Sequence, residues 1–284
     1  MRIRNNFETK DGSLGASGRI LELRRFIPEP DPTSNLRNHV LESLGQAICR
    51  GDLHEGDVLN MDEIAARFKV SRSVVREACG VLAARGLVVS RRRVGTLVQG
   101  VGNWELFNGD VIRWRLNSPD RANQILELAE LRSSLEPAAA ALAAIRATPE
   151  ERAEVDDCAR RLVEAGTRGD IPAFHELDKV FHTLVMTAGH NRMFAQMHHV
   201  IEDLLESRYR QGLMPEQVAN WALAWHEELG RAVVAGDPGA AVAAAERIVA
   251  ASAEEMLELA RLAAHPGNPN YLLTNPPAAG GVEG

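Results

Sequence analysis

The sequence is poor in aromatic residues and contains no long apolar run, and each absence excludes a class of protein. Only 5% of its 284 residues are aromatic, whereas alanine is abundant. This composition favours closely packed helices over a β-rich fold. The longest apolar run, residues 138–145, is far shorter than the roughly 18 residues that indicate a membrane-spanning helix. We therefore expect a mainly α-helical protein that has no membrane partner.

Cysteines are also few, and their spacing excludes the common metal and redox motifs. The three, Cys49, Cys79 and Cys158, include no CxxC pair. Cys49 and Cys79 fall on apolar faces of expected helices, so we interpret them as small buried thiols in a reducing compartment. No apolar segment follows the basic residues Arg2 and Arg4, so we expect no secretory signal. The predicted location is the cytoplasm.

The segment from residue 61 to residue 98 has the pattern of two short helices, a tight turn and a two-stranded wing. Ser71 is suited to cap the second helix, and Gly86 is suited to end it. Residues 87–89 and 96–98 are expected to form the strands of the wing. The inward positions recur with helical spacing: Ile64, Ala65 and Phe68 in the first helix, and Val74, Val75, Ala78, Cys79 and Leu82 in the second.

Charge in this segment indicates what it binds. Between Arg67 and Arg93 there are eight basic residues and one acid, although the whole chain carries a formal net charge of −7. Such a local positive field favours contact with phosphates. Arg72 and Arg76 lie one helical turn apart, and either could read a guanine edge or hold a phosphate. The alternative interpretation is a basic face that is merely solvated.

The rest of the chain predicts a second, purely helical domain. Residues 1–100 contain 16 basic and 12 acidic residues, whereas the remainder contains 16 and 27. About seven helical segments follow Gly109, separated by proline and glycine signals such as Thr148-Pro149 and Ser118-Pro119-Asp120, which also suit helix starts. Short connections favour an antiparallel all-helical bundle. The expected divisions are a flexible extension (1–33), a winged helix-turn-helix domain (34–99), a linker (100–108), a helical effector-binding and dimerisation domain (109–265) and a disordered tail (266–284).

The two motifs VSRSVVREACGVLAARGLV and RRRVGTLV resemble the DNA-binding domain of the GntR family of bacterial transcription regulators. The resemblance implies a winged helix-turn-helix that binds double-stranded DNA. The expected DNA-contacting residues are Arg37, Ser71, Arg72, Ser73, Arg76, Arg93 and Gly95. One departure concerns Asp62 and Glu63, which stand where many members carry a DNA-contacting arginine.

The second half resembles the effector (FCD) domain of the FadR subfamily, through GDVIRWRL, ILELAELRSSLEPAAAALAA, LDKVFHTLVMTAGHNRMF and HEELGRAVVAGDPGAAVAAAERI. NWELFNGDVIRWRL and RIVAAS are most similar to sugar-acid regulators of the D-galactonate type. The resemblance implies a homodimeric repressor of a catabolic operon, which binds a palindromic operator and is released by a small carboxylate such as a sugar acid.

Four ionisable residues are expected to face the interior of the bundle. Asp178 and His182 are four residues apart, so they share one helix face. His226 and Arg132 each lie among apolar positions of other helices. Buried charges of this kind are costly unless they bind one another or a ligand. His175, His190, His198 and His199 are instead expected at the surface or in turns.

The family resemblance leaves two versions of this effector site open. Metal-binding members hold a divalent cation with an Asp, a His four residues later and two further histidines, and the last position corresponds to Ile248 here. Asp178, His182 and His226 could still bind Zn²⁺ with open positions. Alternatively, the pocket is metal-free and Arg132 pairs with a carboxylate.

Two other functions remain to be weighed. One is a metal-responsive regulator in which the cation itself is the signal. The other is a metal-dependent enzyme fused to a DNA-binding head. The bundle has no repeated Glu-x-x-His pair of the di-iron type and no nucleophile beside a positioned base. We therefore expect no enzymatic activity.

Overall fold

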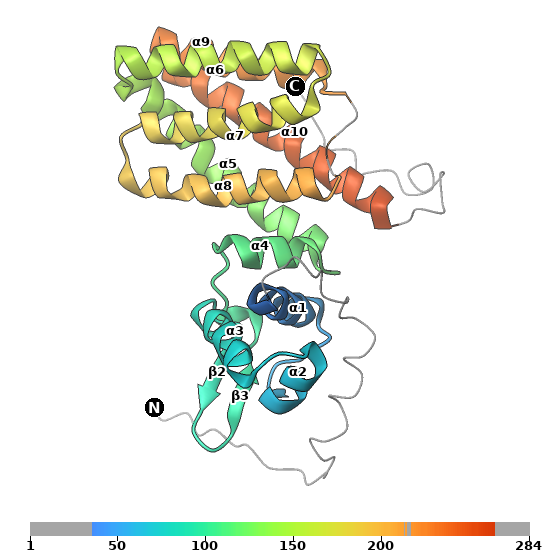
Figure 1. Ribbon diagram of the computed structural model, residues 1–284. Helices are drawn as coiled ribbons and strands as arrows, with labels where there is room; N and C mark the ends of the chain where they lie inside the picture. Colours follow the sequence, from blue (N-terminus) through green and yellow to red (C-terminus); the bar gives the residue numbers. More distant parts are fainter. Residues whose placement is uncertain (1–35, 213, 215–216, 265–284) are drawn as a thin grey trace, which may run out of the picture. The chain divides into compact units, whose positions relative to one another are not determined.

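The computed structural model describes residues 36–212, 214 and 217–264, which form two compact units with their boundary between Glu105 and Leu106 (Figure 1). The predicted extension (1–33) and tail (266–284) lie outside the described residues. Within the described residues, the first unit contains three α-helices and a small sheet, and the regular structure of the second consists of helices. A mainly α-helical architecture is thus confirmed.

The first unit is a winged helix-turn-helix. Its elements are α1 (Leu36–Arg50), β1 (Val58–Leu59), α2 (Met61–Phe68), α3 (Arg72–Ala84), β2 (Val88–Arg91), β3 (Gly95–Val98) and the short 3₁₀ helix η2 (Val101–Asn103). The three strands are antiparallel in the order β1-β3-β2. The sequence did not predict β1, because a two-residue strand has no periodicity of its own. It exists through its pairing with β3, in which Val58 lies opposite Leu97.

Local signals explain where the helices of this unit begin and end. The Ser71 hydroxyl accepts a hydrogen bond from the backbone N–H of Val74 at 3.4 Å, so it caps α3 as expected. The chain leaves α3 through Gly86, whose φ of +75° favours glycine. Val75 and Leu82 have no exposed surface and form part of the core between α3 and α1.

The segment predicted as a linker, 100–108, divides between the two units. The Trp104 indole N–H donates to the Gln99 carbonyl at 2.9 Å. A Cβ at Gly86 would collide with the Asn103 carbonyl, so η2 lies directly against the end of α3. Asn108, by contrast, caps α4 by accepting from the Asp110 backbone N–H at 3.1 Å. Only a few residues therefore separate the two folded units.

The described residues of the second unit form seven helices: α4 (Gly109–Leu116), α5 (Arg121–Arg146), α6 (Pro149–Thr167), α7 (Ile171–Ala188), α8 (Arg192–Arg210), α9 (Asn220–Ala235) and α10 (Pro238–Ala264). The long helices α5 and α10 pack on each other, α6 packs on α7 and α9, and α8 packs on α7 (Figure 1). Thr148 forms the expected capping box with Glu151 at the start of α6.

The predicted helix start at Ser118-Pro119-Asp120 is displaced by a local turn. The Ser118 hydroxyl donates to the carbonyl of Arg115 at 2.7 Å and accepts from the backbone N–H of Asp120 at 3.1 Å. These bonds hold the residues in a turn, and α5 begins only at Arg121.

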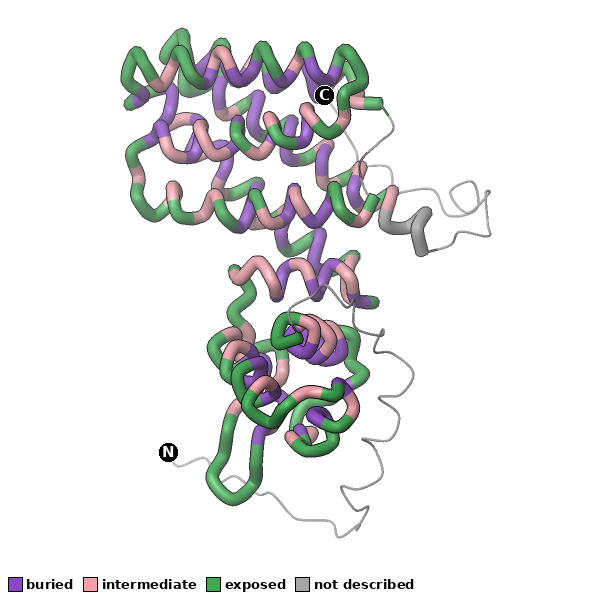
Figure 2. The backbone as a smooth tube through the Cα atoms, in the orientation of Figure 1, coloured by how far each residue is buried: buried purple, intermediate pink, exposed green. Residues whose placement is uncertain are grey.

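Small side chains allow the helices of the second unit to approach closely. Ala140, Ala143, Ala165, Ala241 and Ala244 have no exposed surface. Buried residues lie on the inward faces of the helices, and exposed residues lie on their outer faces (Figure 2). The abundance of alanine is therefore a packing feature of the bundle. Among the described residues, no helix combines the length and apolar character required to cross a membrane.

Candidate effector site and nucleic-acid interface

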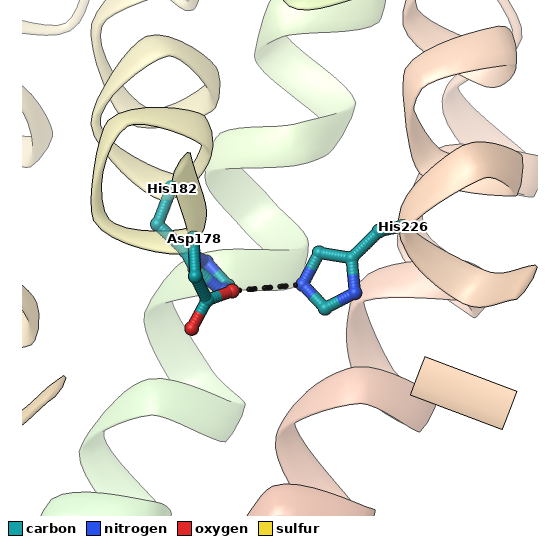
Figure 3. A group of neighbouring side chains, drawn as sticks. All are labelled: Asp178, His182 and His226. Atoms are coloured by element: carbon teal, nitrogen blue, oxygen red, sulfur yellow. Dashed lines mark ion pairs between the residues drawn. The ribbon is translucent and has the colours of Figure 1, made fainter. Parts of the chain in front are cut away.

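Three helices bring the four predicted effector-site residues into the interior of the second unit. α5 supplies Arg132, α7 supplies Asp178 and His182, and α9 supplies His226. Each of the four is no more than 6% exposed. Asp178 and His182 project from adjacent turns of α7 toward His226 (Figure 3). The tertiary structure thus joins residues that lie up to 94 positions apart in the sequence.

The two histidines converge on one carboxylate oxygen. The Nε2 atom of His226 lies 3.1 Å from Oδ1 of Asp178, and the Nε2 atom of His182 lies 3.5 Å from the same oxygen (Figure 3). Ligand atoms of all three residues lie within 4.8 Å of one another. This spacing allows a single small cation to contact all three.

The opposite ring nitrogen of each histidine is held by an acceptor. The Nδ1 atom of His226 donates to the Ala222 carbonyl at 2.6 Å. The Nδ1 atom of His182 lies 2.8 Å from Oε2 of Glu136. A carbonyl or carboxylate on the far side fixes the tautomer that leaves Nε2 available to a metal. Among the described residues, the buried Nε2 of His226 has no aligned hydrogen-bond partner, and its near neighbour is Oδ1 of Asp178.

This orphaned nitrogen shows that the residues fit a cation. A neutral imidazole with its proton on Nδ1 has only a lone pair at Nε2. In that form of His226 the lone pair would lie against Oδ1 of Asp178, and either a proton on Nε2 or a bound cation would stabilise the contact. Asp178, His182 and His226 are also a donor set that suits Zn²⁺ and similar divalent ions.

Glu136 is a further member of this cluster that the sequence interpretation missed. Its Oε1 atom forms an ion pair with Nε of Arg132, and its Oε2 atom contacts His182. We call Arg132, Glu136, Asp178, His182 and His226 the buried polar cluster. The spacing of four between Arg132 and Glu136 was the available signal, because it places both on one face of α5.

The charges of this cluster hold one another ionised. Burial alone would lower the pKa of His182, but the carboxylates of Glu136 and Asp178 outweigh it and raise that pKa to about 9. Burial would raise the pKa of Glu136, yet Arg132 and His182 lower it to about 2. The pKa of Asp178 is likewise held well below its ordinary value against burial, by His182 and His226. Without a metal, His182 therefore carries a proton between two carboxylates.

A small cavity adjoins the buried polar cluster. It encloses about 30 Å³, which is space for one or two water molecules. Arg132, Asp178, His182 and His226 line it together with residues from α8, α9 and α10: Arg208, Trp221, Ile248, Ser252 and Glu255. Ile248, which corresponds by the family resemblance to a fourth metal ligand, gives the cavity an apolar wall.

Arg208 is a second buried cation on this cavity, and the sequence interpretation also missed it. It is 7% exposed and forms an ion pair with Glu255, while its Nη1 atom lies 3.4 Å from Oγ of Ser252. Burial lowers its pKa despite Glu255. The spacing of Arg208 from the buried residues Leu204 and Leu205 was the signal, because it continues the inward face of α8.

One expectation about the other histidines is wrong. His175 is only 1% exposed, because its ring stacks on Tyr209 with centroids 4.3 Å apart and its Nε2 lies 3.1 Å from Oε2 of Glu206. His190 is in a turn beside Glu151, and His199 is exposed. The three cysteines are buried, and burial raises the pKa of the Cys79 and Cys158 thiols to about 11.

In the first unit, the predicted DNA-contacting residues of α3 lie on its exposed face. Arg72, Ser73 and Arg76 are all exposed in the first turns of that helix. The hydroxyls of Ser71 and Ser73 are 2.7 Å apart. Arg72 forms an ion pair with Asp62 of α2. Arg37 is exposed in the first turn of α1, and its Nη2 atom donates to the Asn38 side chain at 3.3 Å.

The wing presents the remaining two predicted residues. Arg93 is exposed at the β2–β3 turn, with a φ of 69°. Gly95 has a φ of +112°, and a Cβ there would lie 3.2 Å from Cγ1 of Val58. Any other residue would be strained at this position. Glycine therefore fits the start of β3, at the tip end of the wing.

A winged helix-turn-helix with a basic outer face, joined to a helical unit with a buried charged cavity, defines a DNA-binding transcriptional regulator. The chain belongs to the GntR family and carries an FCD domain. Residues 36–98 match the family described as bacterial regulatory proteins, gntR family, and residues 127–251 match the FCD domain. The resemblance noted in the sequence is thus confirmed.

Known relatives agree with this assignment. The galactonate operon transcriptional repressor of Escherichia coli (strain K12) is 28% identical over 230 residues, which cover 80% of this chain and 99% of the relative. The HTH-type transcriptional regulator LutR of Bacillus subtilis is 29% identical over 69% of this chain and 90% of its own length. These relatives are transcriptional regulators, so the enzyme alternative is set aside.

Solved structures support the fold. Lar, which controls the expression of the Listeria monocytogenes agr system, matches with a TM-score of 0.58 and 15% identity over 81% of this chain and 100% of Lar. At that level of identity the likeness concerns the fold alone.

Proposed function

We propose that this regulator is ligand-responsive, with the cavity beside the buried polar cluster as its effector site. A divalent cation is held by Asp178, His182 and His226, and a small carboxylate completes the site. The observation that carries the proposal is the Nε2 atom of His226, buried without an aligned hydrogen-bond partner among the described residues and 3.1 Å from Oδ1 of Asp178. A bound cation would place positive charge between these two atoms and would offer open coordination positions for oxygen ligands.

Arg132 is the candidate partner for the carboxylate of the effector. Its Nε atom is committed to Glu136, while its side chain also lines the cavity. The terminal nitrogens of a guanidinium can hold a carboxylate bidentately. Because a homologue is named the galactonate operon transcriptional repressor, we propose a sugar acid as the class of effector. Arg208 supplies a second positive charge on the same cavity.

The size of the cavity connects binding to a conformational change. About 30 Å³ accommodates an ion or a few waters, but a sugar acid requires the walls to separate. The start of α9 forms part of the wall, because Ala219, Trp221 and Ala222 line the cavity, and no side-chain hydrogen bond caps this helix end. Movement of α9 would couple effector binding to the DNA-binding unit and weaken operator binding.

On the DNA side, we propose a homodimer that represses a catabolic operon by binding a palindromic operator through two copies of α3. Arg72, Ser73 and Arg76 provide the exposed face of that helix, and Ser71 caps it. Arg93 and Gly95 bring the wing to the adjacent groove, and Arg37 adds a backbone contact.

A metal-responsive regulator is the second candidate function. The small volume of the cavity favours it, since about 30 Å³ fits a cation more readily than a sugar acid. In this version the cation alone is the signal, and Arg132 has only a structural role with Glu136.

Calorimetric titration of chelator-treated protein with ZnCl₂ tests the cation site. We expect about one ion per chain for the native protein and for His190→Gln, whose histidine is bound only to Glu151 in the turn before α8. His226→Gln should lose this binding while retaining its helical circular dichroism. Absence of Zn²⁺ binding by the native chain would refute the proposed cation site.

A second titration separates the two effector versions. Galactonate is added with and without Zn²⁺, and its binding is compared between the native chain and Arg132→Lys, which retains the charge but not the bidentate geometry. Binding that is lost in Arg132→Lys supports the carboxylate site. If Zn²⁺ alone releases the operator and galactonate does not bind, the metal-responsive function is correct.

A further inference from the structure

The two acidic residues at the start of α2 are held by different partners. The Asn60 side chain caps the helix by accepting from the backbone N–H of Asp62 at 3.0 Å and of Glu63 at 3.4 Å. Nδ2 of Asn60 also donates to Oε1 of Glu63 at 2.8 Å. Glu63 is therefore tied to its own helix. The Asp62 carboxylate instead reaches α3, where it forms an ion pair with Nε of Arg72.

Folding stability does not explain this ion pair. The side chains of Arg72 and Asp62 are 69% and 59% exposed, and ion pairs in such positions contribute little because water screens them. Arg76, one turn further along α3, is also exposed and has no ion-pair partner among the residues that the structure describes. Arg72 and Arg76 thus share one face of α3, but within the described part of the chain only Arg72 is paired with a carboxylate.

We propose that Asp62 is a positioning residue that turns the Arg72 guanidinium toward a guanine base. This rests on the proposed role of α3 in DNA binding. A carboxylate at Nε leaves both terminal nitrogens of the arginine available, and these are the donors that guanine O6 and N7 accept bidentately. Holding Nε also reduces the freedom that a long side chain loses on binding.

The charge of Asp62 further separates base contact from phosphate contact. A carboxylate beside Arg72 repels a phosphate that approaches the same guanidinium, whereas the edge of a guanine carries no net charge. Arg76 has no such neighbour and remains suited to the backbone. Asp62 thus makes Arg72 selective at the expense of general affinity for DNA.

The test compares base preference and non-specific affinity in the full-length protein. Duplexes are selected from a random library with the native chain, and binding is then measured for Asp62→Asn, Glu63→Gln, Arg72→Ala and Arg76→Ala. Glu63→Gln is the matched control, because it removes the same charge from the same turn. Urea unfolding of each variant confirms that the fold is retained.

At the base pair where Arg72→Ala loses its preference for guanine, the same preference should be about tenfold weaker in Asp62→Asn than in the native chain. Its affinity for unrelated DNA should be equal to or higher than that of the native chain. Glu63→Gln should keep the native preference. Both residues act on one base, so adding Asp62→Asn to Arg72→Ala should not further reduce the preference for guanine.

Each contrary result has a distinct meaning. If Asp62→Asn keeps the guanine preference that Arg72→Ala loses, Asp62 does not position Arg72, while the DNA-binding role of α3 stands. Equal loss for Asp62→Asn and Glu63→Gln would show a general charge effect and overturn the inference. Native binding by both Arg72→Ala and Arg76→Ala would instead refute the proposed contacts of α3.

Discussion

Ile248 decides how strongly the proposed cation site can bind. It is 3% exposed on α10 and lines the cavity beside Asp178, His182 and His226. An apolar side chain there leaves three protein ligands, which is the number typical of sites that keep a position open for another molecule. A cation bound by these three residues would therefore keep a coordination position open for another ligand.

Ile248→His should increase the affinity of the chain for Zn²⁺ by at least about tenfold, because it adds a fourth ligand to the same cavity. In chelator the same variant should be less stable to urea, since a buried imidazole replaces an isoleucine. Competition with a chromogenic chelator measures the affinity. Unchanged affinity in a folded variant would show that residue 248 does not face the cation.

Spacing in the sequence was sufficient for part of this site. Asp178 and His182 share a face of α7 because they are four residues apart, and the structure places them together as expected. Glu136 has the same spacing from Arg132 but was missed, since a lone helical ion pair is common. Its importance arises only from the contact with His182, which lies on another helix.

At the scale of helices, close packing between α9 and α6 places His226. Gly230 lies one turn after His226 on α9, and a Cβ there would approach the Cβ of Ala159 in α6 to 2.9 Å. Real Cβ atoms essentially never approach so closely, so the helices would have to separate. Glycine at this position lets α9 bring His226 close enough to Asp178.

Gly230→Ala should destabilise the protein by about 1–3 kcal/mol through overpacking, even though alanine is the better helix former. Its affinity for Zn²⁺ should also fall, because His226 moves with α9. Gly239→Ala in α10 is the control, since the nearest atom to its added Cβ is 3.5 Å away. Urea unfolding and calorimetry give both quantities, and identical midpoints for the two variants would contradict this account.

At the scale of the whole molecule, the buried polar cluster sets how stability depends on pH. The pKa of Glu136 is lowered to about 2 from 4.5, so its contribution is present above pH 4.5 and is lost as the pH falls toward 2. The pKa of His182 is raised to about 9 from 6.5, so its contribution is complete below pH 6.5 and is lost as the pH rises through 9.

Both contributions are complete between pH 4.5 and pH 6.5, so metal-free protein should have its highest urea midpoint in that range. His182→Gln should remove the decline on the alkaline side, because no proton is then held between Glu136 and Asp178. The measurement is a series of urea unfolding curves in chelator across the pH range. An identical alkaline decline in native protein and His182→Gln would assign it to other groups.

The sequence by itself determined the architecture of this protein. Helical periodicity, the Ser71 cap and Gly86 predicted the helix-turn-helix, and charge indicated its DNA partner. These features are local, so a single sequence reveals them. The motifs likewise identified the GntR family and the FCD domain, which the comparisons confirm.

The tertiary structure decided the chemistry. Only folding brings Glu136 against His182, Arg208 onto the cavity and Asp62 onto Arg72. Each contact joins two helices, and its formation depends on packing and burial rather than on spacing within one helix. Tertiary contacts also decide the protonation of His182, because the carboxylates of Glu136 and Asp178 outweigh burial, which alone would lower its pKa.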